Sequence, residues 1–485
     1  MKNVFENTLI TLIILFFFII GILAKTKIDI NSQAVDEFKL PEIEKPTKTS
    51  LHRFSGGLKY KTISNPEYNK TDFSQFTAFI KYIKNQYPLV FSKCELNLIN
   101  KYAVVIHLKG KKNTGYPNLL TAHYDVVGVK DETKWKYSPF SGYFDDEYIY
   151  SRGTIDDKGS VFAILEALNE LLHKGFIPEN DLYIAFSHTE ETGSNQGVQK
   201  IIQYFQSQNI RFNTSLDEGG RIVNKNGKYY AFIGTAEKGR LLTKITVNAK
   251  GGHASVPSNN YAVLKLAKLI TAFERNKPKA LLSKELKEYY IKTYSSYGYI
   301  TKILISNIDI LRPLFYIKMS RNAEDNARLH STYAITVLDA SNVQNAVSPE
   351  ASMIIDARIL PAQTVKDTKK YIEKIVKKAL EEKNVKIEYL SSFEPCVSSN
   401  INSEEYNKLS NNIQKLYPEI TIAPYLTLGS TDAREYSEIS ENTYRFLPAV
   451  LTEYEAALMH SDNEKISLEN WARMIAFYKE FMITR

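Results

Sequence analysis

The chain has 485 residues, a net charge of +8, and apolar and charged fractions of 44% and 24%. This length allows two or three domains with sizeable cores. The composition excludes a disulfide-stapled mini-protein, a disordered chain and a polytopic membrane protein. Basic and acidic residues are interspersed without a basic run, so we expect no nucleic-acid partner.

The N-terminus contains a membrane-targeting segment. Residues 8–24 read TLITLIILFFFIIGILA, carry no charge, and are flanked by Lys2 on one side and by Lys25 and Lys27 on the other. Such a run lies at the short limit for a membrane span and is longer than a usual signal-peptide core. A cleavage site needs small residues, and Ile-Leu-Ala before Lys25 matches it poorly. We therefore predict that residues 1–24 are an uncleaved anchor, with the rest of the chain on the non-cytoplasmic side. The alternative is a cleaved signal peptide of a secreted or periplasmic protein.

The next part of the chain alternates strands and helices. Runs rich in β-branched and aromatic residues occur at 102–108, 118–123 and 181–187, a helical run lies at 160–174, and an amphipathic helix is expected at 73–87. This alternation predicts an α/β domain with a mixed, mostly parallel sheet and helices on both faces.

A different order follows residue 239. Strands are expected at 241–251, 333–341, 351–359 and 385–393, and helices at 261–276 and 365–383. The order β-α-β-β-α-β is the ferredoxin-like split motif, which predicts an inserted α+β lid or dimerisation domain. Residues 280–330 are extra, rich in Tyr and Lys, and without a clear period. The expected segments are 1–24 (targeting), 25–54 (polar tether), 55–238 and 397–485 (the two parts of the catalytic domain) and 239–396 (the inserted domain).

Acidic and imidazole residues repeatedly follow the predicted strands, where α/β folds place their ligands. They form five clusters: His123 with Asp125, Asp156 with Asp157, Glu190 with Glu191, Asp217 with Glu218, and His460 near the C-terminus. A His beside an Asp is often a structural pair, and an acidic turn before a helix is often a cap. Adjacent carboxylates at a strand end, however, repel each other unless a positive charge lies between or beyond them.

Two imidazoles and several carboxylates, without a thiolate, suit a pair of Zn²⁺ ions or similar metals such as Co²⁺ or Mn²⁺. Two such ions need one shared carboxylate and further ligands of their own. The spare member of the Glu190–Glu191 pair could act as the base, and Asp125 could orient the His123 imidazole. Cys94 and Cys396 form no CxxC motif and could be one disulfide or two buried thiols.

The clusters belong to five motifs in a fixed order: H-x-D, S-R-G-T-x-D-D-K-G, E-E-x-G-S, L-D-E-G-G and H-x-x-N-E. Together they resemble the co-catalytic dizinc exopeptidases that include carboxypeptidase S, aminoacylase-1 and the bacterial glutamate carboxypeptidase. The likeness extends from about residue 55 to the C-terminus and is strongest to the carboxypeptidase S branch. It implies a zinc-exopeptidase fold and hydrolysis of an amide bond next to a free carboxylate, in a small peptide or, alternatively, in an N-acyl amino acid. A homodimer is compatible with it.

The resemblance also implies roles for individual residues. His123 would bind one metal, Asp156 would bridge both, Glu190 would be the general base, and Glu191 and His460 would bind the second metal. The fourth motif offers Asp217 or Glu218 as the last ligand, and we expect Asp217 first.

Further residues match substrate-binding positions of that family. His253, in the sequence GGHAS, resembles a histidine that stabilises the oxyanion, often in a partner subunit. Asn345 and Arg358 match positions that hold the substrate carboxylate and carbonyl, although a salt bridge on a strand is the ordinary role of such an Arg. Gly429, Thr431 and Arg434 of LGSTDARE would lie near the bound carboxylate. The rival hypothesis, an inactive binding ectodomain, predicts loss of the base or ligands, and the sequence keeps them all.

Overall fold

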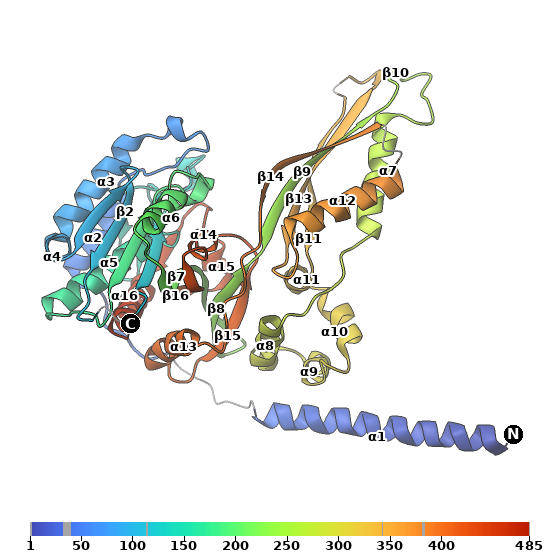
Figure 1. Cartoon of the computed structure of the whole chain (residues 1–485), viewed down its shortest axis with the longest axis horizontal. Coiled ribbons are helices and arrows are strands. Elements are labelled where there is room, and N and C mark those ends of the chain that lie inside the picture. The colour runs from blue at the N-terminus through green and yellow to red at the C-terminus, as the bar shows by residue number, and fades with distance from the viewer. Residues whose placement is uncertain (1, 33–39, 113–114, 342, 381–383, 485) are drawn as a thin grey trace. The chain divides into compact units, whose positions relative to one another are not determined.

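The structure, a computed structural model, describes residues 2–32, 40–112, 115–341, 343–380 and 384–484 (Figure 1). It divides into two compact units, which we describe separately. The main unit comprises 35–235, 399–425 and 431–485, and the small unit comprises 1–34, 236–398 and 426–430. The chain thus leaves the main unit for a long insertion at 236–398, and again for the short segment 426–430, before it ends in the main unit.

The main unit is built on a mixed eight-stranded sheet. In spatial order its strands are β1 (Glu95–Ile99), β2 (Ala103–Leu108), β6 (Leu182–Ser187), β3 (Asn118–His123), β7 (Phe212–Lys225), β16 (Ser440–Val450), β8 (Lys228–Glu237) and β15 (Thr421–Thr427). The central strands β6, β3, β7 and β16 are parallel. The predicted α/β class is confirmed. A second, three-stranded sheet contains β4 (Tyr143–Phe144), β5 (Tyr148–Tyr150) and β17 (Lys465–Ser467).

Helices cover both faces of the main sheet because its strands are apolar on both sides. On β2, Val104 and Ile106 pack into one core and Ala103 and Val105 into the other, as the period of two in a strand requires. Helices of the first core are α2 (Lys48–Leu58), α3 (Phe73–Gln86), α4 (Pro88–Lys93), α5 (Lys158–His173), α13 (Glu404–Leu416) and α16 (Leu468–Ile483), and those of the second are α6 (Val198–Ser207) and α14 (Ala433–Tyr436). Short elements of the loops are α15 (Glu453–Ala456), η1 (Tyr68–Lys70), η2 (Glu132–Lys134) and η3 (Glu190–Thr192).

The small unit has the predicted split β-α-β order. Its elements are β9 (Gly239–Asn248), α7 (Ala262–Arg275), β11 (Thr332–Asp339), β13 (Glu350–Ile359), α12 (Val365–Ala379) and β14 (Val385–Phe393). The strands form an antiparallel sheet in the order β11-β13-β9-β14, and α7 and α12 pack on it around one core. A short ribbon pairs β10 (Gly252–His253) with β12 (Ala346–Val347). A helix was expected at 365–383. Its last three residues, 381–383, lie outside the described part of the chain.

The extra segment at 280–330 is helical. It contains α8 (Lys284–Lys292), η4 (Tyr294–Ser296), α9 (Tyr299–Ser306), α10 (Arg312–Met319) and α11 (Ala323–Leu329). An aromatic core joins these helices: the Tyr290 and Phe315 rings meet edge to face with centroids 4.9 Å apart, and Arg328 stacks over Tyr289. The sequence did not predict these helices, because about two helical turns are too few to establish a helical period of apolar residues.

The N-terminal helix α1 (Lys2–Ser32) is longer than the targeting segment predicted at 1–24. Its stretch Ile10–Ile30 has a mean hydropathy of 2.2 and is long and apolar enough to cross a membrane. Residues 25–32 contain no Pro or Gly, so nothing ends the helix between residue 24 and Ser32.

The polar tether expected at 25–54 is correspondingly shorter in the structure. Its first residues belong to the end of α1, and its last residues belong to α2, which begins at Lys48 with Thr47 as its N-cap. Phe54 of α2 is buried in the main core. Within the remainder, residues 33–39 lie outside the described part of the chain. Of the two cysteine alternatives, the structure has no disulfide: neither Cys94 nor Cys396 forms one.

Candidate metal centre

Three of the five predicted clusters meet at the carboxyl ends of the parallel strands. β3 ends at His123, which is in register with Ser187 at the end of β6. The 3₁₀ helix η3, which begins at Glu190, follows β6, and Glu218 lies on β7, the parallel neighbour of β3 on its other side. Parallel strands end at the same edge of a sheet, so these side chains are brought together.

The other two clusters reach this edge from loops. Asp156 precedes α5, and its Oδ1 lies 2.9 Å from Nε2 of His123. His460 lies between α15 and β17, and its Nε2 is 2.9 Å from Oδ2 of Asp156 and 3.0 Å from Oε2 of Glu191. Asp156 therefore presents one carboxylate oxygen to each of the two histidines.

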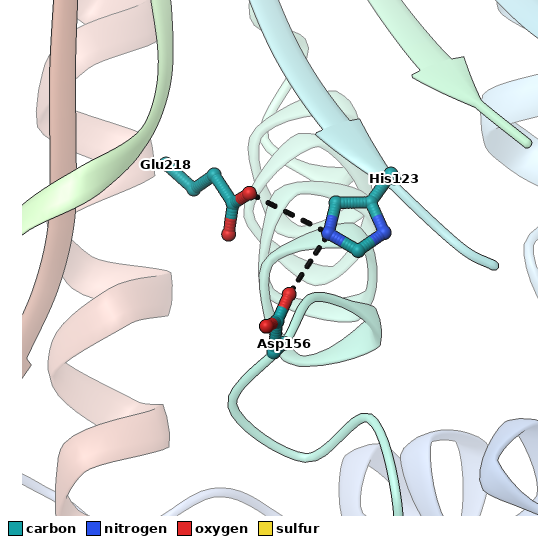
Figure 2. Close-up of side chains that lie close together, drawn as sticks. All are labelled: His123, Asp156 and Glu218. Atoms are coloured by element: carbon teal, nitrogen blue, oxygen red, sulfur yellow. Dashed lines mark hydrogen bonds and ion pairs between the residues drawn. The ribbon is translucent and has the colours of Figure 1, made fainter. Parts of the chain in front are cut away.

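Two groups of potential metal ligands result, and they share Asp156. One contains His123, Asp156 and Glu218, whose ligand atoms lie within 4.8 Å of one another, and the other contains Asp156, Glu191 and His460 at the same spacing. Figure 2 shows the first group: the carboxylates of Asp156 and Glu218 both point at Nε2 of His123, with Glu218 Oε1 at 3.5 Å. This is the pattern expected of two neighbouring metal ions with one bridging carboxylate.

The donor set fits divalent cations. Imidazole nitrogens and carboxylate oxygens are ligands of Zn²⁺ and of similar metals. Oε1 of Glu191 is buried and has no hydrogen-bond partner within the described residues, which is costly for a carboxylate unless a cation satisfies it. The residues present therefore fit a pair of metal ions.

The electrostatics of the cluster reflect crowded buried carboxylates. Burial, followed by repulsion from Asp156, raises the pKa of Glu218 to about 7. Burial also raises the pKa of Glu190 well above its ordinary value. Burial alone would lower the pKa of His123, but the surrounding carboxylates, Glu218 first, raise it well above its ordinary value. A bound cation would replace these protons as the compensating charge.

Asp125 organises two parts of the site at once. Its carboxylate accepts hydrogen bonds from the backbone N–H groups of Glu190 (3.1 Å) and Glu191 (3.2 Å) and from the Ser64 hydroxyl (2.6 Å). The partner of Nδ1 of His123 is the backbone oxygen of Asp125 (3.0 Å), with the carboxylate at 3.5 Å. The sequence led us to expect the carboxylate itself as that partner. Asp125 thus fixes the orientation of His123 and the position of the glutamate pair.

The structure brings Glu218, and not Asp217, to His123 within the described residues. Neighbouring residues of a strand point to opposite faces of the sheet. Because Asp217 and Glu218 are neighbours on β7, only one of their carboxylates can point toward His123. The Asp217 carboxylate is buried. The pKa of Asp432 is raised to about 8, first by the burial of Asp432 itself and then by the negative charge of Asp217. We expected Asp217 as the first choice, and the geometry favours Glu218.

Glu464 is a positioning residue that the sequence reasoning missed. Its fully buried carboxylate forms an ion pair with Nη1 of Arg152 (2.5 Å). It also accepts hydrogen bonds from the backbone N–H groups of Gly153 (3.1 Å), Ile155 (2.8 Å) and Asp156 (3.3 Å). It therefore holds the loop that presents Asp156. The signal was available, because Glu464 is the last residue of the H-x-x-N-E motif.

We expect Glu464→Gln to destabilise the protein and weaken metal binding. The substitution keeps the shape but leaves the Arg152 charge buried without its partner, a loss of about 3–5 kcal/mol. Thermal unfolding with and without added zinc measures both effects. The double variant Arg152→Met/Glu464→Gln should recover part of the stability because it removes the unpaired charge. A single variant as stable as the unmodified chain would contradict this role.

The remaining predicted residues fall in both units. In the main unit, Thr431 precedes α14 and Arg434 lies on it, with Nε of Arg434 3.1 Å from the Glu435 carboxylate. In the small unit, His253 and Asn345 are neighbours, because the Asn345 carbonyl accepts the backbone N–H of Ala254 (2.9 Å). Arg358 pairs with Asp356 on the same strand, and Gly429 follows β15. Their roles toward a substrate stay predictions.

The sequence of the chain matches a known family. Residues 119–484 match the family described as Peptidase family M20/M25/M40. The chain belongs to this family. A "Probable carboxypeptidase S-like 2" of Dictyostelium discoideum is 33% identical to this M20 chain over 436 residues, which are 88% of this chain and 83% of that protein. An "N-fatty-acyl-amino acid synthase/hydrolase PM20D1" of Homo sapiens is 31% identical over 431 residues, 87% of this chain and 84% of that protein.

Solved structures support the same fold. An M20 family metallo-carboxypeptidase, Sso-CP2 from Sulfolobus solfataricus, superposes with a TM-score of 0.66 at 19% identity, over 90% of this chain and 99% of that one. Membership of the M20 family confirms that the chain is an enzyme, a metal-dependent hydrolase. The predicted resemblance is thereby confirmed.

Proposed function

We propose that this M20 enzyme is a two-metal hydrolase, using zinc, that cleaves an amide bond next to a free carboxylate. The observation that carries the proposal is the pair of ligand groups that share Asp156. His123 and Glu218 would hold one ion and Glu191 and His460 the other. When bound, such a pair of ions supplies Lewis-acid chemistry: it activates water and polarises the amide carbonyl.

The proton transfers fall to Glu190. Its carboxylate lies 4.0 Å from Nε2 of His123, a member of the first ligand group, and belongs to neither group. It can therefore accept a proton from the attacking water at a carboxylate oxygen and deliver it to the leaving amine. Asp125 supports this step, because it holds the backbone of Glu190 through a hydrogen bond.

The free carboxylate of the substrate needs a cationic partner. Arg434 and Arg358 supply guanidinium groups, Asn345 an amide group and Thr431 a hydroxyl group, all suited to carboxylate and carbonyl oxygens. The similarity to carboxypeptidase S-like proteins supports a small peptide with a free C-terminus as the substrate. An N-acyl amino acid offers the same amide bond and carboxylate, and the similarity to PM20D1 supports this second substrate class.

A substrate panel tests the proposal. The purified full chain in detergent, loaded with zinc, should hydrolyse N-blocked dipeptides or N-acyl amino acids and release the free amino acid. The matching amides, in which the carboxylate is replaced by a carboxamide, should be poor substrates because the guanidinium contact is lost. Equal rates for acids and amides would refute carboxylate recognition, and the ratio between peptide and fatty-acyl substrates would decide between the two classes.

We expect His253→Ala to lower kcat while KM changes little. The resemblance gives this histidine the stabilisation of the oxyanion, an interaction that strengthens in the transition state. Steady-state kinetics on the best substrate of the panel measure the two constants. His173→Ala, at the exposed end of α5, is the matched control and should leave both unchanged. A raised KM at an unchanged kcat would assign His253 to substrate binding instead.

We further propose that α1 stays attached as a membrane anchor, with the two units on the non-cytoplasmic side. The apolar stretch Ile10–Ile30 has the length of a membrane span, and most of its large apolar side chains from Ile10 to Ile28 are 41–67% exposed. A soluble protein does not expose so much contiguous apolar surface. A cleaved signal peptide is the alternative, and N-terminal sequencing of the mature protein separates the two.

A further inference from the structure

Helix α1 docks on the helical insertion of the small unit through buried polar contacts. Asn307, directly after α9, donates from Nδ2 to Oγ1 of Thr26 (3.2 Å) and to the Ile22 carbonyl (3.4 Å), and the Tyr294 hydroxyl donates to the Thr26 carbonyl (3.3 Å). Thr26 is fully buried and Asn307 nearly so. Figure 1 shows α9 beside the C-terminal part of α1.

These contacts fix the level of α9 along the anchor. Ile22 belongs to the uncharged run, whereas Lys25 and Lys27 are the first charges after it. Lysines that follow a membrane span place their ammonium groups at the membrane–water interface. Since Lys25 also donates to the Ser306 carbonyl at the end of α9, α9 is attached to the turn of α1 that leaves the bilayer.

The helices at this level expose large apolar side chains. Tyr299 and Ile300 at the start of α9, Ile310 between the helices, and Leu314 and Ile317 on α10 are 55–69% exposed. We call these five residues the α9–α10 apolar face.

The core of the insertion does not need these side chains. It is filled by other apolar residues of the same helices: Leu304, Ile305, Ile308, Phe315 and Met319. Leu314 and Ile317 are three residues apart and so lie on one side of α10. Tyr299 is the residue type enriched at membrane interfaces, and the basic residues Lys302, Arg312 and Lys318 lie among the apolar positions.

We infer that the α9–α10 apolar face rests in the interfacial layer of the bilayer that α1 enters. The chain then has a second membrane contact beside its anchor, made by apolar side chains with basic neighbours that suit lipid phosphates. The bilayer is the occupant that the contacts favour, because α1 itself brings this face to the membrane surface. The inference rests on the membrane placement proposed above for α1, but not on the proposed substrate.

Fluorescence quenching by lipids tests the inference on the full chain. In a Cys94→Ser background, the variants Ile300→Cys, Leu314→Cys and Ile317→Cys each carry a bimane label, and the protein is reconstituted in vesicles of phosphatidylcholine and phosphatidylserine. Phospholipids with a doxyl quencher near the headgroup should quench all three labels. Leu15→Cys, in the middle of the apolar run, is the positive control and is read with phospholipids that carry the doxyl group deep in the acyl chain. Ile177→Cys, an exposed apolar position of the main unit, is the matched negative control.

The outcomes separate the two proposals. Quenching at Leu15 with no more quenching at residues 300, 314 and 317 than at Ile177 would overturn the second contact while the anchor stands. No quenching at Leu15 would overturn both. The triple variant Ile300→Ser/Leu314→Ser/Ile317→Ser should lose the quenching of a label placed at Ile310→Cys, yet keep kcat/KM on a soluble substrate. A label in that variant that stays as strongly quenched would also overturn the inference.

Discussion

Replacing Glu190 by Gln should reduce kcat by about 10³-fold or more, because the amide cannot accept the proton that a general base must take. The metal content should stay at two ions per chain, since Glu190 belongs to neither ligand group. Metal analysis of the purified variant, combined with steady-state kinetics on the best substrate, measures both quantities.

The neighbouring residue provides the contrast for this prediction. Glu191 carries a buried carboxylate 3.0 Å from His460, so Glu191→Gln should lose metal together with activity. A Glu190→Gln enzyme with nearly unchanged turnover would remove Glu190 from the mechanism. Metal loss in Glu190→Gln and metal retention in Glu191→Gln would show that the two roles are exchanged.

Asp156→Asn should have an effect on both ions. In the structure each oxygen of this carboxylate faces a different histidine, His123 or His460. An amide offers one oxygen and no charge, so the variant can complete only one group at best. We expect at most about one metal ion per chain and a loss of kcat/KM of at least about 10³-fold.

A control must separate metal loss from unfolding. Glu166 is also buried and paired, with Arg53 (3.2 Å) and the Tyr87 hydroxyl (2.8 Å), but it lies outside both ligand groups. Glu166→Gln should lower the melting temperature and still bind two ions in the folded protein. Two ions bound to Asp156→Asn would contradict the bridging role of Asp156.

Much of the fold follows from sequence patterns that act locally. The strand expected at 118–123 is β3 with the same bounds, because a fully buried apolar run ends at a polar functional residue. The helix expected at 160–174 is α5, which starts two residues earlier. The insertion at 280–330 could not be predicted in this way. Its α-helices have only seven to nine residues each, and a shared core of aromatic rings holds them together.

The sequence predicted which clusters of residues form the candidate site, but not how their side chains are arranged in space. Composition and order identified the clusters, and the parallel strands explain why they converge. The choice between Asp217 and Glu218 depends on which face of β7 meets His123, and strand pairing decides that. Glu464 ends the H-x-x-N-E motif, but its role was missed because it accepts hydrogen bonds from backbone N–H groups of residues 155 and 156, far earlier in the chain, and the motif alone does not show these contacts.

The position of β16 has a consequence for biosynthesis. This strand lies between β7 and β8 in the main sheet, although both neighbours precede the whole inserted unit in the chain. During translation the nascent sheet therefore lacks a central strand until the whole insertion has been synthesised, and His460 emerges later still. Assembly of the proposed two-metal centre would then follow synthesis of the insertion, and chains truncated before β16 should be unable to form the complete centre.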